Sequence, residues 1–324
     1  MKVETINIYE GRNDVTLTTY VLDDSKETRK GAPRPAVLIC PGGAYLNCSD
    51  REAEPVAMRF AAMGYHAFVL RYSVYFQGEG GFTDMPEQFE IKPEIIYPAA
   101  MIEIAKALKL IEKNAEKWHV DMDKVALCGF SAGAHNCGMY AVYWNQSIIT
   151  EKISDEKPVK PTAVILGYPL TDYVYMKSTM KDTPITEGLF TLSNLAYLGT
   201  AEPTDEQLDE VSPARHISKD VPPIFLWATS TDELVPVQHS LVMAKALADH
   251  HIPFEMHIFE EGSHGLSLGT QATAESIKQV SPEIQPWMQL AEKWLLKRMA
   301  YKLPEKTDME LMMEQLQEEG ELQK

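Results

Sequence analysis

The sequence predicts an α/β fold in which helices cover both faces of a mainly parallel sheet. Short apolar runs alternate with longer stretches of helical spacing along most of the chain, which is typical of strands that alternate with helices. Most of the runs are continuously apolar, as expected of strands buried on both faces. No repeat or low-complexity linker divides the 324 residues, of which 45% are apolar, so one large domain is expected over residues 1–303.

The expected strands fall into two groups. Residues 3–8 and 15–22 alternate apolar and polar side chains, which is typical of half-buried antiparallel strands. Apolar runs then predict buried strands at residues 35–40, 65–70 and 125–128, and further strands are expected at 163–167, 224–228 and 254–259. Helical spacing predicts helices at residues 51–63, 95–118, 134–144, 237–250 and 286–299.

Two stretches interrupt this alternation. Residues 75–93 contain a cluster of glycines and several aromatic residues, and residues 171–222 mix polar and short apolar segments. Insertions of this length often line a pocket, so we expect both near the functional site, although solvated loops are the alternative.

The C-terminal residues 304–324 form an acidic tail that is expected to be helical. Its apolar residues have helical spacing, namely Met309, Met312, Met313 and Leu316. Such a helix would pack on the body or on another subunit, so a homodimer or higher homo-oligomer is compatible with the sequence. A frayed, solvated tail is the alternative.

Charge and cysteine usage narrow the class of protein. A formal charge of −17 and a pI near 5.0 disfavour binding to nucleic acid or to an anionic membrane. The first residues lack the apolar core of a signal peptide, and no run approaches the roughly 18 apolar residues of a membrane helix. The four cysteines have no metal-ligand spacing, which favours free thiols in a reducing compartment. We therefore expect a cytoplasmic protein without a metal or cofactor.

The most informative motif is Gly-Phe-Ser-Ala-Gly at residues 129–133, between an expected strand and an expected helix. A serine on so sharp a turn has a strained backbone, and its neighbours two positions away crowd together. Glycine at both positions removes the Cβ atoms that would collide, so the Ser131 hydroxyl becomes exposed. A glycine-rich turn without chemistry is the alternative that the context must exclude.

A serine hydroxyl becomes a nucleophile when a base takes its proton and a carboxylate orients that base. Asp232 follows the expected strand at 224–228, and His264 lies on a small-residue loop after the strand at 254–259. The carboxyl ends of parallel strands gather active sites, so Ser131, Asp232 and His264 are predicted to form a catalytic triad. Glu233 is the rival acid, in a less usual position.

Small residues follow the first buried strand, in the run Cys-Pro-Gly-Gly-Ala-Tyr at residues 40–45. Acyl transfer builds negative charge on the carbonyl oxygen, and backbone N–H groups can stabilise that charge. We expect the amides of Gly43, Ala44 and Ala132 to form this oxyanion hole. A simple tight turn is the alternative.

These motifs resemble the α/β-hydrolase superfamily, in particular the esterase branch related to hormone-sensitive lipase. The chain departs from the His-Gly-Gly-Gly motif of that branch, with Pro41 and Ala44 at two of its positions. The runs at residues 41–45, 51–57 and 64–73 are more similar to small bacterial acetyl esterases and acetylxylan esterases. The resemblance covers about residues 35–298 and implies the α/β-hydrolase fold, with about eight strands.

The resemblance also implies removal of acetyl or other short acyl groups from a small-molecule ester, such as an acetylated sugar or xylooligosaccharide. Tyr45 and Tyr75 are expected to form an aromatic wall for the substrate, and ordinary core positions are the equal alternative. For Tyr72 the core position is favoured. Two alternatives stay open, a serine peptidase of the prolyl-oligopeptidase type and a non-catalytic binding protein. Glu52 and Glu54 would weakly imitate the amine-binding pair of such a peptidase.

Overall fold

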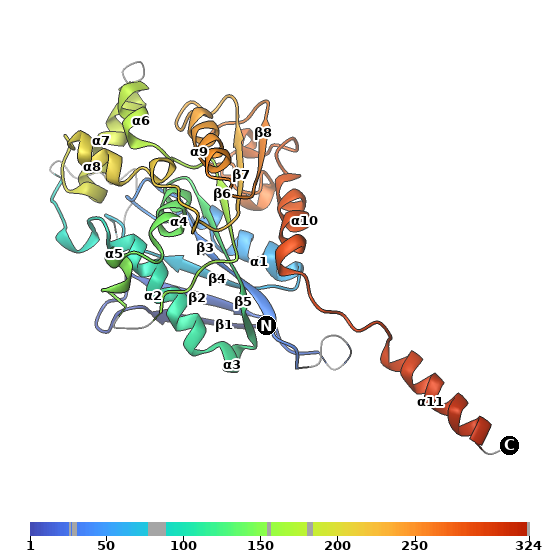
Figure 1. Ribbon diagram of the computed structural model, residues 1–324. Coiled ribbons are helices and arrows are strands. Elements are labelled where there is room, and N and C mark those ends of the chain that lie inside the picture. Colours follow the sequence, from blue (N-terminus) through green and yellow to red (C-terminus); the bar gives the residue numbers. More distant parts are fainter. Residues whose placement is uncertain (26, 28–30, 77–88, 154–156, 180–183, 323–324) are drawn as a thin grey trace.

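Figure 1 shows the computed structural model, in which helices cover both faces of one twisted sheet. The structure describes residues 1–324 except residues 26, 28–30, 77–88, 154–156, 180–183 and 323–324. The α/β-hydrolase fold predicted from the sequence is confirmed: among the described residues, eight strands lie in the order β1-β2-β4-β3-β5-β6-β7-β8.

The sheet is antiparallel at its N-terminal edge and parallel elsewhere. The pairs β1–β2 and β2–β4 are antiparallel, and every other neighbouring pair is parallel. The strands are β1 (Lys2–Asn7), β2 (Thr16–Val21), β3 (Arg34–Cys40), β4 (His66–Arg71), β5 (Val120–Phe130), β6 (Ala163–Gly167), β7 (Ile224–Thr229) and β8 (Phe254–Phe259).

The helices connect the strands and form two layers. The α-helices are α1 (Glu54–Ala62), α2 (Ala99–Lys113), α3 (Ala115–Trp118), α4 (Ala132–Tyr143), α5 (Ser147–Thr150), α6 (Tyr173–Thr179), α7 (Pro184–Leu198), α8 (Asp205–Glu210), α9 (Gln238–Asp249), α10 (Trp287–Met299) and α11 (Asp308–Leu322). Short 3-10 helices lie at η1 (Asp50–Glu52), η2 (Pro93–Ile95), η4 (Pro213–Arg215), η5 (Gln271–Thr273) and η6 (Ile277–Gln279).

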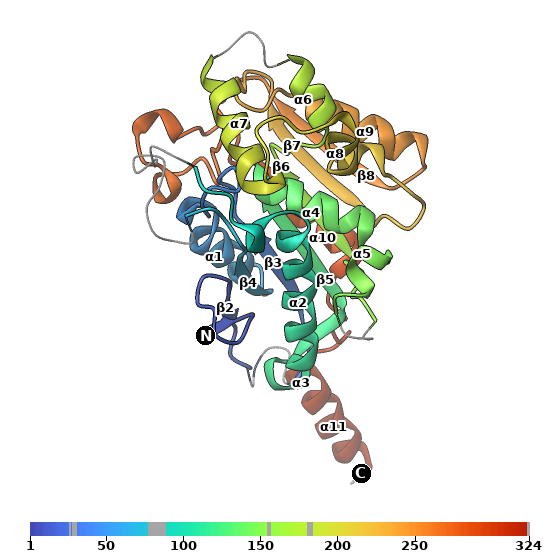
Figure 2. The same ribbon diagram turned by 90° about the vertical axis from the view of Figure 1, so that its left-hand side faces the viewer.

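Alternate residues of the central strands face opposite layers, because successive side chains of a strand point to opposite faces. Leu38 and Leu127 belong to a core shared with α2, α4 and α9, whereas Val37 and Ala126 belong to a second core under α1 and α10. Figure 2 shows α2 and α4 together on the near side of the sheet. Both faces are therefore buried, as the continuous apolar runs predict.

Two of the expected helices are divided. The helix expected at 95–118 is interrupted before α2 by Pro98, which has no N–H to donate, and after it by Asn114, whose side chain hydrogen-bonds the carbonyl of Leu110. The helix expected at 51–63 begins only at Glu54, because Ala53 has φ −102° and ψ −104°. The residues before it form η1, which belongs to the functional site.

The structure describes one of the two expected insertions almost completely and the other only in part. Most of 75–93 lies outside the described residues. Residues 171–222 form α6, α7, α8 and η4, and Figure 2 shows α6 and α7 above the carboxyl ends of the central strands.

The acidic tail forms α11, which extends away from the body in both views. Its side chains at Met309, Met312, Met313 and Leu316 are exposed, so the structure does not pack this helix on the body. We propose that residues 1–303 act as one domain, with this tail as an appendage.

Candidate active site

Ser131 lies on the turn between β5 and α4, and its backbone is strained as the motif predicts. It has φ 50° and ψ −119°, a conformation that side-chain-bearing residues rarely adopt. A Cβ atom on Gly129 would lie 2.3 Å from the carbonyl oxygen of Gly133, and one on Gly133 would lie 2.0 Å from that of Cys40. Only glycine fits at either position, so the turn needs both.

A chain of hydrogen bonds joins Ser131 to the two other residues of the predicted triad. The Ser131 hydroxyl lies 2.8 Å from Nε2 of His264, and Nδ1 of His264 lies 2.7 Å from Oδ2 of Asp232. The other oxygen of Asp232 accepts hydrogen bonds from the amides of Leu234 and Val235, each at 2.9 Å. The Asp232 carboxylate requires a proton on Nδ1, so Nε2 is left free to accept the serine proton.

The rival acid does not take part. Glu233 is exposed, whereas its neighbour Asp232 is 5% exposed and faces His264. The structure thus brings together the serine, histidine and aspartate that the strand ends indicate.

The environment of His264 raises its pKa. Burial is the largest single influence and lowers the pKa, because it penalises the charged imidazolium. The negative charge of Asp232, its hydrogen bond and the charge of Glu52 together outweigh burial, so the pKa of His264 is raised above its ordinary value of 6.5. His264 is therefore a stronger base than a free histidine.

The expected oxyanion loop lies beside Ser131. Gly43 has φ 137°, and a Cβ atom there would lie 2.2 Å from the carbonyl oxygen of Asn47, so this turn also requires glycine. Gly43 and Ala44 line the same cleft as Ser131 and His264. No residue that the structure describes accepts a hydrogen bond from the amides of Gly43, Ala44 or Ala132. These three N–H groups are therefore available to a substrate oxygen.

Glu52 supports this loop, a role that the sequence did not reveal. Its side chain is 4% exposed, and its Oε2 accepts a hydrogen bond from the amide of Gly42 at 2.7 Å. Its Oε1 accepts a hydrogen bond from the Tyr168 hydroxyl, which in turn accepts one from the amide of Ser267 at 3.1 Å. Burial raises the pKa of Glu52, against the lowering effect of these hydrogen bonds. An acid ten residues after Gly42 gives no sequence signal for this contact.

Arg51, next to Glu52 on η1, holds the loop that carries His264. Its guanidinium donates hydrogen bonds of 2.6 Å to the carbonyl oxygens of Thr273 and Gly265, and its own carbonyl accepts one from the Ser267 hydroxyl at 2.7 Å. One short turn thus connects the oxyanion loop to the histidine loop.

Tyr45 and Tyr75 line neither of the two cavities that Ser131 lines. Tyr45 has φ 58° and is 2% exposed, because it stacks on Tyr197 and hydrogen-bonds Nδ1 of His135 at 2.6 Å. Tyr75 is 6% exposed and stacks on Phe89. Tyr72, in contrast, is one of the residues that line the larger cleft.

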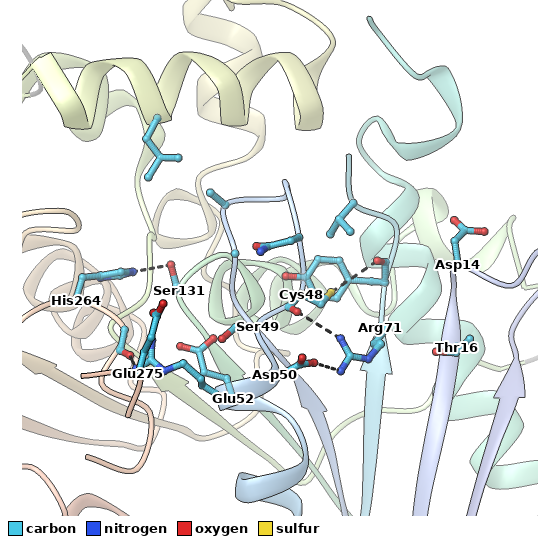
Figure 3. Close-up of a pocket in the computed structure, with 18 of the residues that line it drawn as sticks. Asp14, Thr16, Cys48, Ser49, Asp50, Glu52, Arg71, Ser131, His264 and Glu275 are labelled. Carbon is cyan, nitrogen blue, oxygen red and sulfur yellow. Dashed lines mark hydrogen bonds and ion pairs between the residues drawn. The ribbon is translucent and has the colours of Figure 1, made fainter. Parts of the chain in front are cut away.

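Ser131 lies between two cavities of opposite character. The larger, of about 790 Å³, extends past Asp50 and Arg71 to Asp14 and is lined mainly by polar residues; Figure 3 shows Ser131 and His264 at one end and Asp14 and Thr16 at the other. We call it the polar cleft. The smaller, of about 50 Å³, lies under α6 and α7 and is mostly apolar. We call it the apolar pocket.

The polar cleft continues beyond the Arg71–Asp50 ion pair. A further hollow of about 430 Å³ shares Asp50, Arg51 and Arg71 with it and reaches Thr18 and Tyr20 of β2. Among the described residues, no group of three or more His, Cys, Asp or Glu side chains could hold a metal ion, and no helix could span a membrane. All four cysteines are free.

Comparison with known proteins gives the family. A family model described as BD-FAE matches residues 22–247. The endo-1,4-beta-xylanase B of Butyrivibrio fibrisolvens is 33% identical over 242 residues, which are 72% of this chain and 33% of that protein. The chain spans between 33% and 49% of the length of the curated relatives it matches.

Two solved structures resemble the whole chain. The carboxylesterase Cest-2923 of Lactobacillus plantarum WCFS1 is 27% identical with a TM-score of 0.74, and the match covers 94% of this chain and 100% of that one. The acetyl ester-xyloside bifunctional hydrolase of Caldicellulosiruptor lactoaceticus is 26% identical with a TM-score of 0.70, over 92% of this chain and 97% of that one. The resemblance inferred from the motifs is confirmed: the chain belongs to the BD-FAE family and has the α/β-hydrolase fold.

Proposed function

We propose that the protein is a serine carboxylesterase that hydrolyses short-chain acyl esters through a covalent acyl-enzyme. The observation that carries this proposal is the hydrogen-bonded chain from Asp232 through His264 to Ser131. It lies beside three backbone amides that no described residue engages. A nucleophile, its base, an orienting acid and donors for the oxyanion are the parts that acyl transfer requires.

In the first half-reaction, Oγ of Ser131 attacks the ester carbonyl while Nε2 of His264 takes its proton. The carbonyl oxygen becomes an oxyanion, which the amides of Gly43, Ala44 and Ala132 stabilise. The imidazolium of His264, stabilised by Asp232, then gives the proton to the alcohol oxygen as the carbon–oxygen bond breaks. The alcohol leaves and Ser131 carries the acyl group.

In the second half-reaction, water enters the position that the alcohol has left. His264 takes a proton from this water, and the resulting hydroxide attacks the acyl carbon. The intermediate collapses, the proton returns to Oγ of Ser131 and the free acid departs. The enzyme regains its initial state without a cofactor.

The comparisons support an acetylated carbohydrate as the substrate. One similar structure is described as an acetyl ester-xyloside hydrolase, and one similar sequence as a xylanase. The polar cleft supports the same choice, because a sugar requires many hydrogen-bonding partners along its length. We propose acetylated sugars or xylooligosaccharides as the natural substrates.

The peptidase alternative is disfavoured by the positions of its two candidate acids. Glu52 is buried and accepts hydrogen bonds from Gly42 and Tyr168, and Glu54 accepts one from the Tyr20 hydroxyl at 3.0 Å. Glu52 is therefore not free to receive the amino terminus of a peptide, and Glu54 does not line the polar cleft that contains Ser131. Absence of cleavage of a dipeptide anilide would agree with this interpretation.

The test is the variant Ser131→Ala, compared with Ser281→Ala, which alters a half-buried serine that contacts Glu283. We expect Ser131→Ala to lose turnover of p-nitrophenyl acetate and labelling by a fluorophosphonate, with an unchanged circular dichroism spectrum. Ser281→Ala should keep both. A Ser131→Ala protein that retains a near-full rate would refute the mechanism. Release of acetate from acetylated xylooligosaccharides by the unmodified protein tests the substrate class.

A further inference from the structure

The two cavities at Ser131 differ in which catalytic groups they reach. Ser131, Ala44, Leu189 and Leu234 line both the polar cleft and the apolar pocket. His264 lines only the polar cleft, and Ala132 lines only the apolar pocket. The two halves of an ester bound at Ser131 would therefore lie in different surroundings.

The position of His264 determines which cavity holds the alcohol part of the ester and which holds the acyl part. In the proposed mechanism His264 protonates the alcohol oxygen, so this oxygen must lie within hydrogen-bonding reach of Nε2. That requirement places the alcohol in the polar cleft. The acyl chain, on the other side of the carbonyl carbon, then enters the apolar pocket, where Leu170, Met176 and Val235 exclude water from it.

The size of the apolar pocket limits the acyl chain. Its volume is about 50 Å³, against about 790 Å³ for the polar cleft on the same scale, so it suits a small group. We expect it to take an acetyl, propionyl or butyryl chain more readily than an octanoyl chain.

Phe190 is one of the residues that line the apolar pocket. It is 7% exposed and packs beside Tyr173, with ring centroids 5.6 Å apart. Phe190 also lines a second hollow, of about 400 Å³, together with Glu187, Ala201 and Pro203. Phe190 is thus shared by a small apolar pocket and a larger hollow.

We propose that the apolar pocket under α6 and α7 is the acyl site, that Phe190 is the wall that restricts it to chains of about two to four carbons, and that the polar cleft binds a polyhydroxylated alcohol. This proposal rests on the proposed esterase function. It assigns the acyl-length specificity to a residue of the insertion at 171–222.

The experiment measures kcat/KM for p-nitrophenyl acetate, butyrate and octanoate, with the alcohol held constant, in the unmodified protein and in Phe190→Ala. We expect the unmodified protein to prefer acetate and butyrate. Removal of the ring joins the pocket to the hollow, so the octanoate-to-acetate ratio should rise about tenfold or more. The readout is this ratio rather than the rate with acetate alone, because Phe190 itself borders the acyl site.

Leu192→Ala is the matched control. Leu192 is partly buried on the same helix but lines neither cavity, so its loss should leave the chain-length preference unchanged. Phe190→Leu, which shortens the wall but keeps it apolar, should give an intermediate ratio. It also keeps the test valid if Phe190→Ala fails to fold, as judged by its thermal melting curve.

Three results would overturn the proposal. One is a folded Phe190→Ala or Phe190→Leu variant with the chain-length profile of the unmodified protein. Another is an unmodified protein that cleaves octanoate or a cinnamoyl ester as fast as acetate. The third is the same change of profile in Leu192→Ala. Failure of the esterase function itself looks different, because the unmodified protein would then cleave none of the esters.

Discussion

The carboxylate of Glu52 accepts a hydrogen bond from the amide of Gly42 at 2.7 Å, and this contact holds the turn on which the amides of Gly43 and Ala44 face the cleft. The same carboxylate accepts a hydrogen bond from the hydroxyl of Tyr168. Glu52 therefore acts on the reaction through the residues that it positions.

Glu52→Gln should lower kcat for p-nitrophenyl acetate about tenfold or more, with a smaller change in KM. The glutamine amide has one acceptor oxygen for two donors, so the Gly42 turn loses its fixed position and the oxyanion is stabilised less well. Glu54→Gln is the control, because it makes the same change two residues away at a carboxylate bound only to Tyr20. Equal rates in the two variants would contradict the positioning role.

The rate should depend on the protonation of His264. Only a neutral Nε2 can take the serine proton, so kcat/KM should fall as the pH drops through the pKa of His264. Because Asp232 raises this pKa above 6.5, the midpoint should lie on the alkaline side of that value. A pH–rate profile of kcat/KM measures it directly, and a rate that stays constant down to pH 4.5 would exclude His264 as the base.

Asp232→Asn should lower kcat by about 10²- to 10⁴-fold, because the imidazole loses the acceptor that orients it and the charge that stabilises the imidazolium. The midpoint of the pH profile should also move toward lower pH, since the influence that raises the pKa is removed. The exposed neighbour Glu233 provides the control. Glu233→Gln should keep both kcat and the midpoint of the pH profile. A large loss of kcat in Glu233→Gln but not in Asp232→Asn would show that Glu233 is the catalytic acid.

Gly133→Ala should destabilise the protein by about 3 kcal/mol or more, because its Cβ atom would lie 2.0 Å from the rigid carbonyl of Cys40. Gly188→Ala on α7 meets no atom within 4 Å and should instead stabilise by about 0.4–1 kcal/mol. Urea denaturation of both variants measures the difference. A Gly133→Ala protein as stable as the unmodified protein would contradict the claim that this position requires glycine.

Tyr45→Phe should lower the free energy of unfolding by about 1–3 kcal/mol, because Nδ1 of His135 loses its donor in the core. Nε2 of His135 bonds the carbonyl of Val211 and cannot compensate. Activity toward p-nitrophenyl acetate should be nearly unchanged, since Tyr45 does not line either cavity. A large change in KM with unchanged stability would restore Tyr45 as a substrate contact.

Features that local sequence determines were predictable, whereas features that depend on contacts formed only in the folded chain were not. The central strands were predictable because continuous apolar runs mark burial on both faces. Ser131, Asp232 and His264 were predictable because each follows an expected strand. The burial of Tyr45 was not predictable, since it accompanies a positive φ at this residue. The role of Glu52 was not predictable either, because its contact with Gly42 depends on α1 beginning only after Ala53.

Both loops of the active site depend on the same short element, η1. Arg51 anchors the segment that bears His264, and Glu52 anchors the turn before Gly43, so a single local loosening on warming would disturb proton transfer and oxyanion binding at once. The eight-stranded sheet does not depend on those contacts. Hydrolytic activity should therefore disappear at a lower temperature than the secondary structure.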